Sequence, residues 1–354
     1  MQSVLRELRD LALILGPARL DTVYFGGGTP SLLEPAQIGA VLDAAARCFV
    51  LTKGVEITVE ANPESALRKG FLDGLRVLGV NRLSLGVQSL QDDLLAMLGR
   101  IHDSAQARRA ARAILDAGIE NLSLDLIWGL PGQDLSRWMR DLAAAASLEP
   151  THLSCYGLTL EEGTALTGRV ETGALALPGE EDCVRMYLMG AEYLESRGFR
   201  HYEVSNFATP GRESRHNSGY WAGQDYLGLG PSAVSTRGDR RWTNPADLGG
   251  YTALIAQGGK RDVEILSEEV RRRETVMLTL RTFGGLDLEQ LKAMVGNDFP
   301  PGFRPAVERL RSSGLVRLDS GHLYLTRAGM LVSNSIIELV LDHLDRVHDD
   351  TGNL

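Results

Sequence analysis

The sequence predicts an α/β protein whose main domain is a barrel of parallel β-strands that alternate with helices. Predicted strands and helices alternate regularly over residues 21–158, which is typical of parallel βα units. Polar or glycine residues stand at the carboxyl end of each predicted strand, where barrels of this class carry their ligand sites. Three helical segments and a short hairpin near the carboxyl end of the chain predict a smaller α+β domain that resembles a winged helix.

The barrel elements follow from the spacing of apolar residues. Strands are predicted at 21–25, 55–60, 82–87, 122–127 and 151–158. Apolar residues that recur every three to four positions predict amphipathic helices at 1–15, 35–49, 67–78, 104–117 and 136–147. Strands separated by helices of this length cannot form hairpins, so we expect them to pair in parallel.

The regular alternation ends after residue 159. A helix is predicted at 180–197, a further strand beside the barrel at 201–206, and a loop-rich stretch at 210–245. The carboxyl-terminal domain is predicted to contain helices at 268–282, 288–294 and 303–313, hairpin strands at 315–318 and 323–326, and a last helix at 328–344. We therefore expect three segments: a partial barrel at 1–165, a barrel extension at 166–265 and the winged-helix-like domain at 266–354.

Composition narrows the functional classes. The 354 residues carry a net charge of −9, which disfavours a nucleic-acid surface, because phosphate binding depends on clustered Lys and Arg. No apolar run approaches the ~18 residues of a membrane span, and no signal peptide is visible, so we expect a cytoplasmic protein. Cys48, Cys155 and Cys183 are widely separated and match neither a disulfide framework nor a metal-binding spacing; Cys48 and Cys155 are expected to be buried structural thiols.

The most informative stretch is the turn Gly26-Gly27-Gly28 that follows the first strand. Consecutive glycines expose the main chain to a ligand and permit positive φ angles, and Pro30 ends the strand. Alone, such a turn fits a ligand site or a tight barrel turn equally well. Glu60, Gln88 and Asp125 stand at three other strand ends and should converge on it, although Glu60 and Asp125 could instead cap neighbouring turns.

Five motifs occur in a recognisable order. They are Gly26-Gly27-Gly28-Thr29-Pro30, Glu60-Ala61-Asn62-Pro63, Gly86-Val87-Gln88-Ser89, Gly99-Arg100-Ile101-His102 and Asp125-Leu126-Ile127-Trp128-Gly129-Leu130-Pro131. Together they resemble the radical S-adenosylmethionine superfamily and, within it, the oxygen-independent coproporphyrinogen III oxidase-like family. The later motif His216-Asn217-x-x-Tyr220-Trp221 is similar to that of the heme chaperone branch of this family.

The resemblance implies a site for each ligand. The main chain of Gly27, Gly28 and Thr29 would hold S-adenosylmethionine. The side chains that would contact its polar groups are those of Glu60, Gln88, Arg100 and Asp125. Carboxylates can accept from ribose hydroxyls or an ammonium group, and an arginine can pair with a carboxylate; without the motif, Arg100 could equally be a helix-end residue bonded to carbonyls. His216 is the candidate heme ligand or pocket residue, with His201 ranked below it; a structural hydrogen-bonding role for the His216 motif is the alternative.

One family feature is missing from the chain. The Cys-x3-Cys-x2-Cys motif, which ligates a [4Fe–4S] cluster through thiolates, is absent. Residues 1–15 are typical of a crossover helix, which needs a parallel strand before it as well as after it. We therefore expect a partial (β/α)6 TIM-like barrel that lacks its first strand, with that strand and the cluster cysteines encoded upstream of Met1; a cluster-free descendant is the alternative.

The leading functional prediction is a heme chaperone that binds S-adenosylmethionine and heme and delivers heme to hemoproteins. One alternative is an oxygen-independent coproporphyrinogen III oxidase, a dehydrogenase-like oxidoreductase of porphyrin biosynthesis that decarboxylates propionate side chains. Another is a cluster-free barrel that binds a nucleotide or phosphate at the glycine turn. Heme and recipient hemoproteins are the expected partners, nucleic acid is not, and a homodimer is compatible with the sequence.

Overall fold

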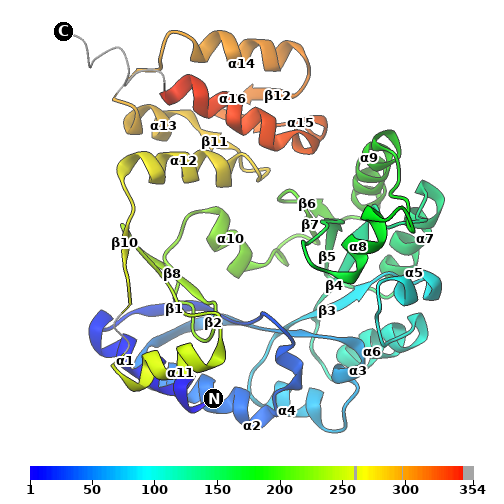
Figure 1. Ribbon diagram of the computed structural model, residues 1–354, viewed down its shortest axis with the longest axis vertical. Helices are drawn as coiled ribbons and strands as arrows, with labels where there is room; N and C mark the ends of the chain where they lie inside the picture. Colours follow the sequence, from blue (N-terminus) through cyan, green and yellow to red (C-terminus); the bar gives the residue numbers. More distant parts are fainter. Residues whose placement is uncertain (259–260, 297, 346–354) are drawn as a thin grey trace. The chain divides into compact units, whose positions relative to one another are not determined.

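The fold is described from a computed structural model for residues 1–258, 261–296 and 298–345 (Figure 1). The chain forms two compact units. The first contains residues 1–201 and 205–216, and the second contains residues 202–204 and those from 217 onward. The end of the predicted third segment, residues 346–354, lies outside the described residues, and the three-segment division of the chain stays a prediction.

The first unit is built on a seven-stranded sheet in the order β1-β2-β3-β4-β5-β7-β6. Its strands are β1 (Arg19–Phe25), β2 (Val50–Ala61), β3 (Arg82–Gln88), β4 (Asn121–Trp128), β5 (His152–Gly157), β6 (Arg200–His201) and β7 (Asn206–Ala208). Strands β1 to β5 are parallel and neighbour one another in chain order, so the predicted half-barrel of parallel strands is confirmed. Strands β6 and β7 are antiparallel and extend it at the β5 edge.

The single strand predicted at 201–206 is wrong. Residues 202–204 leave the sheet, because Val204 N donates to Arg281 O and Phe283 N donates to Tyr202 O, both at 2.9–3.0 Å. The chain therefore adds two short strands to the sheet, β6 before residues 202–204 and β7 after them.

Helices connect the parallel strands. The longer ones are α1 (Gln2–Leu15), α2 (Pro35–Cys48), α6 (Ser104–Asp116), α7 (Leu135–Ala146) and α9 (Glu180–Ser196). Shorter ones are η1 (Pro30–Leu32), α3 (Pro63–Ala66), α4 (Phe71–Val77), α5 (Asp92–Met97) and α8 (Ala165–Glu171). The helix predicted at 67–78 starts too early: α3 ends at Ala66, and α4 begins only at Phe71, because its N-cap Gly70 adopts φ 74°, a left-handed conformation outside the helix.

The two faces of this sheet differ in polarity. The apolar face packs against α2, α4, α6, α7 and α9, which border the sheet in Figure 1. Its strand residues include Val23, Ile57, Val59, Leu83, Leu85, Leu122, Leu124, Leu153 and Phe207. Burial of this surface against the helices is the main source of stability in this unit.

The opposite face, here called the polar face, carries the alternate residues of the same strands. Register places Thr22 beside Glu56 and Tyr24 beside Thr58. Further rows run across the sheet as Thr58-Arg82-Asn121, Glu60-Ser84-Ser123-His152 and Gly86-Asp125-Ser154-Asn206. Parallel sheets covered by helices on both faces are apolar on both, so this pattern identifies a face that is not a second helix-packing surface.

The second unit has two small antiparallel sheets. The first, β10-β9-β8, contains β8 (Val234–Arg237), β9 (Arg240–Thr243) and β10 (Glu264–Ile265), and α11 (Leu248–Ala256) follows β9 in the chain. The predicted loop-rich stretch at 210–245 holds three short elements, α10 (Arg215–Trp221), β8 and β9, and is otherwise turns and irregular chain. The boundary between the two units falls inside α10, between His216 and Asn217.

The carboxyl-terminal part combines helices with the sheet β11-β13-β12, as expected for a winged-helix-like domain. Its elements are α12 (Glu268–Thr279), β11 (Leu286–Asp287), α13 (Leu288–Met294), α14 (Phe303–Ser312), β12 (Val316–Asp319), β13 (His322–Leu325), α15 (Arg327–Leu331) and α16 (Ser333–Asp345). The last predicted helix is interrupted at Val332, which has a non-helical backbone conformation. In the part of the chain that the structure describes, no helix is both long and apolar enough to cross a membrane.

Candidate functional site

The glycine turn directly follows β1 at the carboxyl edge of the sheet. Gly27 and Gly28 adopt φ angles of 77° and 61°, which explains why glycine is needed at both positions. A Cβ added at either would meet no atom within 4 Å, so the main chain here faces open space. Thr29 follows with φ −138°, and its carbonyl accepts from Leu32 N at 3.0 Å to begin η1. The turn therefore presents bare backbone, as the sequence predicted.

Glu60 contacts this turn directly. Its Oε2 accepts from Gly27 N at 3.1 Å, and its Oε1 accepts from the hydroxyl of Tyr24 at 2.6 Å. Strand pairing of β1 with β2 brings these residues together, because Tyr24 lies opposite Thr58, two positions before Glu60 on the same face. Burial and the Glu60 carboxylate raise the pKa of Tyr24, which keeps its phenol protonated as a hydrogen-bond donor.

Asp125 lies on the polar face two strands away from Glu60. Its carboxylate accepts from Ser84 Oγ at 3.0 Å and from Ser123 Oγ at 3.3 Å. Burial raises the pKa of Asp125 to about 6, and the Glu60 carboxylate adds to the rise. Because Ser84 pairs with Glu60 in register and bonds to Asp125, the two carboxylates flank one serine on the same face.

Gln88 ends β3 with a strained backbone. Its φ is 68°, in the left-handed region that residues other than glycine rarely adopt, and the strand register shifts between Gly86 and Gln88. A Cβ on Gly86 would lie 3.0 Å from Gln88 Nε2 and 3.1 Å from Asn62 Oδ1, so these two amides converge above a glycine. Strain of this kind concentrates at ligand sites.

Arg100 makes no hydrogen bond or ion pair to Gly27, Glu60 or Asp125 among the contacts of the described residues. It follows α5, with its backbone N donating to Leu95 O, and the Glu64 carboxylate interacts with it electrostatically. Burial lowers the pKa of Arg100, and Glu64 opposes that change. His102, two residues later, is buried between Glu64 Oε2 at 3.4 Å and Val87 O at 3.2 Å. Glu64 therefore links Arg100 and His102 electrostatically, whereas Glu60 bonds to Gly27 and Asp125 bonds to Ser84, the register partner of Glu60.

His216 lies on the polar face against the middle of β1 and β2. The Glu56 carboxylate accepts from the backbone N–H groups of Arg215 and His216 at 3.1 and 3.0 Å, which fixes the first turn of α10. The imidazole Nδ1 is 2.9 Å from Thr22 Oγ1, and the ring stacks on Tyr24 at 4.5 Å with 13° between planes. Burial lowers the pKa of His216 to about 4, so the ring is neutral at pH 7.

His201 lies on the other face of the sheet. It is 6% exposed, stacks on Phe207 at 4.0 Å and meets the edge of Tyr187 at 5.9 Å. Phe207 pairs with Leu153, which belongs to the apolar core. This aromatic stack gives His201 a packing role and places it on the face opposite His216.

The cysteines of this chain do not fit an iron–sulfur cluster. Cys48 is on α2, Cys155 on β5 and Cys183 on α9, and no group of three His, Cys, Asp or Glu residues within residues 1–258, 261–296 and 298–345 could hold a metal ion. Cys155 is buried as predicted, whereas Cys48 is only half-buried. Burial raises the pKa of Cys155 and of Cys183, which disfavours the thiolate that a cluster requires.

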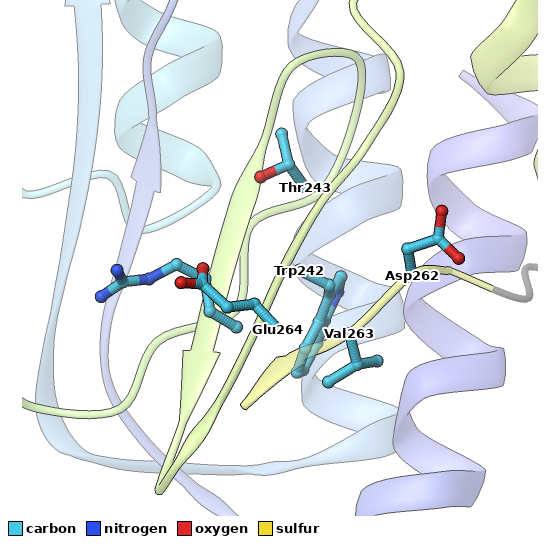
Figure 2. A pocket seen from close by; sticks show the side chains of 6 residues that line it. Trp242, Thr243, Asp262, Val263 and Glu264 are labelled. Atoms are coloured by element: carbon cyan, nitrogen blue, oxygen red, sulfur yellow. The ribbon is translucent and has the colours of Figure 1, made fainter. Parts of the chain in front are cut away.

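The second unit holds a cavity of about 430 Å³ (Figure 2). Its lining residues are Arg241, Trp242, Thr243, Asp262, Val263 and Glu264, and the predicted ligand residues are not among them. Arg241 is already held by Glu274 through two bonds of 2.6 and 2.8 Å. None of the lining residues belongs to the polar face or to the glycine turn.

The sequence interpretation missed Thr22, Tyr24, Glu56 and Ser84. All four belong to strand segments in which polar and apolar residues alternate, as in Glu56-Ile57-Thr58-Val59-Glu60. That alternation is the signal that could have found them, because it identifies a sheet face lined with polar side chains.

Comparisons with known proteins agree with this architecture. Residues 2–145 match the radical SAM superfamily, and residues 266–332 match the HemN C-terminal domain. Coproporphyrinogen III oxidase (HemN) from Escherichia coli, described as a radical SAM enzyme, has the same fold with a TM-score of 0.80, covering 96% of this chain and 82% of that chain at 24% identity.

Relatives found by sequence identify a narrower family than the fold comparison does. The chain is 34% identical to heme chaperone HemW of Bacillus subtilis, over 96% of this chain and 90% of the relative. It is 36% identical to heme chaperone HemW of Mycobacterium tuberculosis, over 95% of this chain and 84% of the relative. Since these matches extend over both units, the chain belongs to the HemW family of heme chaperones within the radical SAM superfamily.

Proposed function

We propose that this protein binds heme on the polar face beside His216 and passes it to recipient hemoproteins, with S-adenosylmethionine bound at the glycine turn. The relatives named as heme chaperones support the first part. The observation that carries the proposal is the fixation of His216: one carboxylate, one hydroxyl and one aromatic ring hold it against β1 and β2.

The setting of His216 suits iron ligation. A ligating imidazole must be neutral, and the pKa of about 4 provides that form at pH 7. A histidine that ligates a metal commonly donates a hydrogen bond from its other ring nitrogen to an oxygen. Thr22 Oγ1 lies 2.9 Å from Nδ1 of His216.

The residues around the glycine turn suit S-adenosylmethionine. When bound, its sulfonium centre would supply activated carbon–sulfur bonds. Its amino acid and ribose groups need donors and acceptors, and Gly27, Gly28, Glu60 and Asp125 offer both. Two inward polar atoms support a polar occupant of this face, because Thr58 Oγ1 and Asn206 Oδ1 are buried and lack a hydrogen-bond partner among the described residues.

Heme binding is tested by titrating hemin into the wild-type protein and His216→Ala while recording the heme absorption spectrum. We expect the variant to lose the ligated spectrum, while His322→Ala, on the β13 hairpin, retains it. Identical spectra for the wild-type protein and His216→Ala would rule out ligation by His216.

Binding of S-adenosylmethionine is tested by calorimetry with Asp125→Ala and Arg100→Ala. Each lost charged hydrogen bond should weaken affinity about tenfold to a hundredfold. Asp116→Ala is the matched control, because Asp116 is exposed at the end of α6 and pairs only with Arg112 among the described ion pairs. Unchanged affinity in both test variants would move the ligand away from these strand ends.

A further inference from the structure

A continuous series of contacts joins His216 to the glycine turn. The His216 ring stacks on Tyr24 at 4.5 Å, and the Tyr24 hydroxyl donates to Glu60 Oε1 at 2.6 Å. The other oxygen of Glu60 accepts from Gly27 N at 3.1 Å. All four residues belong to the first unit, so the series lies within one compact body.

Each link in this series is restrained. His216 is fixed at its backbone by Glu56 and at its ring by Thr22. The bond from Tyr24 to Glu60 is short and charge-assisted, which makes it one of the stronger kinds of hydrogen bond. Because the His216 ring is held in place and stacked on Tyr24, we expect a change in its position to shift Tyr24.

Tyr24 also packs on the turn itself. A Cβ on Gly26 would lie 2.5 Å from Cε1 of Tyr24 and 3.1 Å from Glu60 Oε1, so only glycine allows the ring and the carboxylate to approach. The ring thus contacts the histidine on one side and the first glycine of the turn on another. This contact gives a physical reason for Gly26 that is separate from ligand binding.

We propose that Tyr24 is a positioning residue that couples His216 to the glycine turn, so that heme and S-adenosylmethionine each strengthen the binding of the other. This inference rests on the proposed function. A carboxylate offers about four acceptor positions, and Tyr24 and Gly27 occupy two of those on Glu60, leaving others for a ligand. Heme held at His216 steadies the Tyr24 ring, and the steadied ring keeps Glu60 oriented for S-adenosylmethionine; by linkage the effect is reciprocal.

A double-mutant cycle tests the coupling. Affinity for S-adenosylmethionine is measured by calorimetry in the wild-type protein, Tyr24→Phe, His216→Ala and the double variant. We expect Tyr24→Phe to weaken affinity about tenfold while preserving the hemin spectrum, because phenylalanine keeps the stacking surface. His216→Ala should weaken affinity several-fold in the wild-type background and not at all in the Tyr24→Phe background. Tyr193→Phe, which removes another tyrosine hydroxyl that is bonded to Arg197, is the matched control.

A measurement without ligands separates this inference from the proposed function. The amide NMR resonance of Gly27 should shift in His216→Ala, and the shift should vanish when Tyr24 is already phenylalanine. If the wild-type protein binds no S-adenosylmethionine but the Gly27 shift follows this pattern, the proposed function fails at the glycine turn and the positioning role stands. Independent, additive effects of the two substitutions on affinity, or a Gly27 resonance indifferent to His216, would overturn the positioning role.

Discussion

The two faces of the parallel sheet show how one set of strands serves stability and binding separately. Leu83, Leu85 and Leu124 are fully buried among helices, whereas Ser84, Ser123 and Asp125, their immediate neighbours in sequence, form a hydrogen-bonded row on the other face. Strand geometry makes this division possible, because successive side chains point to opposite sides. The apolar face can therefore keep the fold while the polar face keeps charged groups that cost stability.

The largest expected effect is on the apolar face. Leu124→Ala should lower the free energy of unfolding by about 2–5 kcal/mol, because it leaves a cavity in a fully buried cluster. Urea denaturation measures this loss. A loss below about 1 kcal/mol would mean that the helices do not pack on this face as described.

Asp125 should show the opposite behaviour, since its carboxylate disfavours folding when ionised. Its pKa is about 6 in the folded protein and about 3.9 in an unfolded chain. The stability that the Asp125 carboxyl contributes to the folded state is therefore fully present below pH ~4 and is lost as the pH rises through 6. Asp125→Asn should therefore be more stable than the wild-type protein by about 1–2 kcal/mol near pH 8, an advantage that disappears near pH 4. Denaturation at both pH values checks this, and an equal difference at both would contradict it.

His216 should make the polar face sensitive to acid. Its pKa is about 4 in the folded protein against about 6.5 unfolded, so stability is fully present above pH 6.5 and declines as pH falls toward 4. His216→Phe retains an aromatic ring against Tyr24 and cannot titrate. We expect its stability to fall less, by about 1 kcal/mol, between pH 7 and pH 4.5, and parallel pH curves for the two proteins would exclude this role.

The smallest effect is expected at Thr58, whose buried hydroxyl has no hydrogen-bond partner among the described residues. Thr58→Val should change the free energy of unfolding by no more than about 0.5 kcal/mol, because it replaces an unsatisfied polar group with an apolar one of similar shape. The reverse exchange on the neighbouring residue, Val59→Thr, should cost about 1–3 kcal/mol. Equal costs for the two would remove the distinction between the faces.

The sequence predicted most of the barrel because its signals are local. Strands β1 to β5 and helices α2, α6, α7 and α9 each follow from apolar spacing within about a dozen residues, and the motifs at their ends indicated the family. The errors occur where the local pattern is overruled: the left-handed Gly70 delays the start of α4 to Phe71, and residues 202–204 bond to 281–283 instead of the sheet. Neither break can be inferred from apolar spacing alone.

By itself, the sequence determined the parallel strands, the bare glycine turn and three polar strand residues, Glu60 and Gln88 near the ends of β2 and β3 and Asp125 inside β4, since each depends on neighbours in the chain. Only the tertiary structure decided that His216 meets Thr22, 194 positions away, and that Tyr24 stands between His216 and Glu60. Such contacts depend on strand register and on where α10 docks. Both are set by the packing of the whole unit, which is why a pattern read along the chain could name the histidine but not its partners.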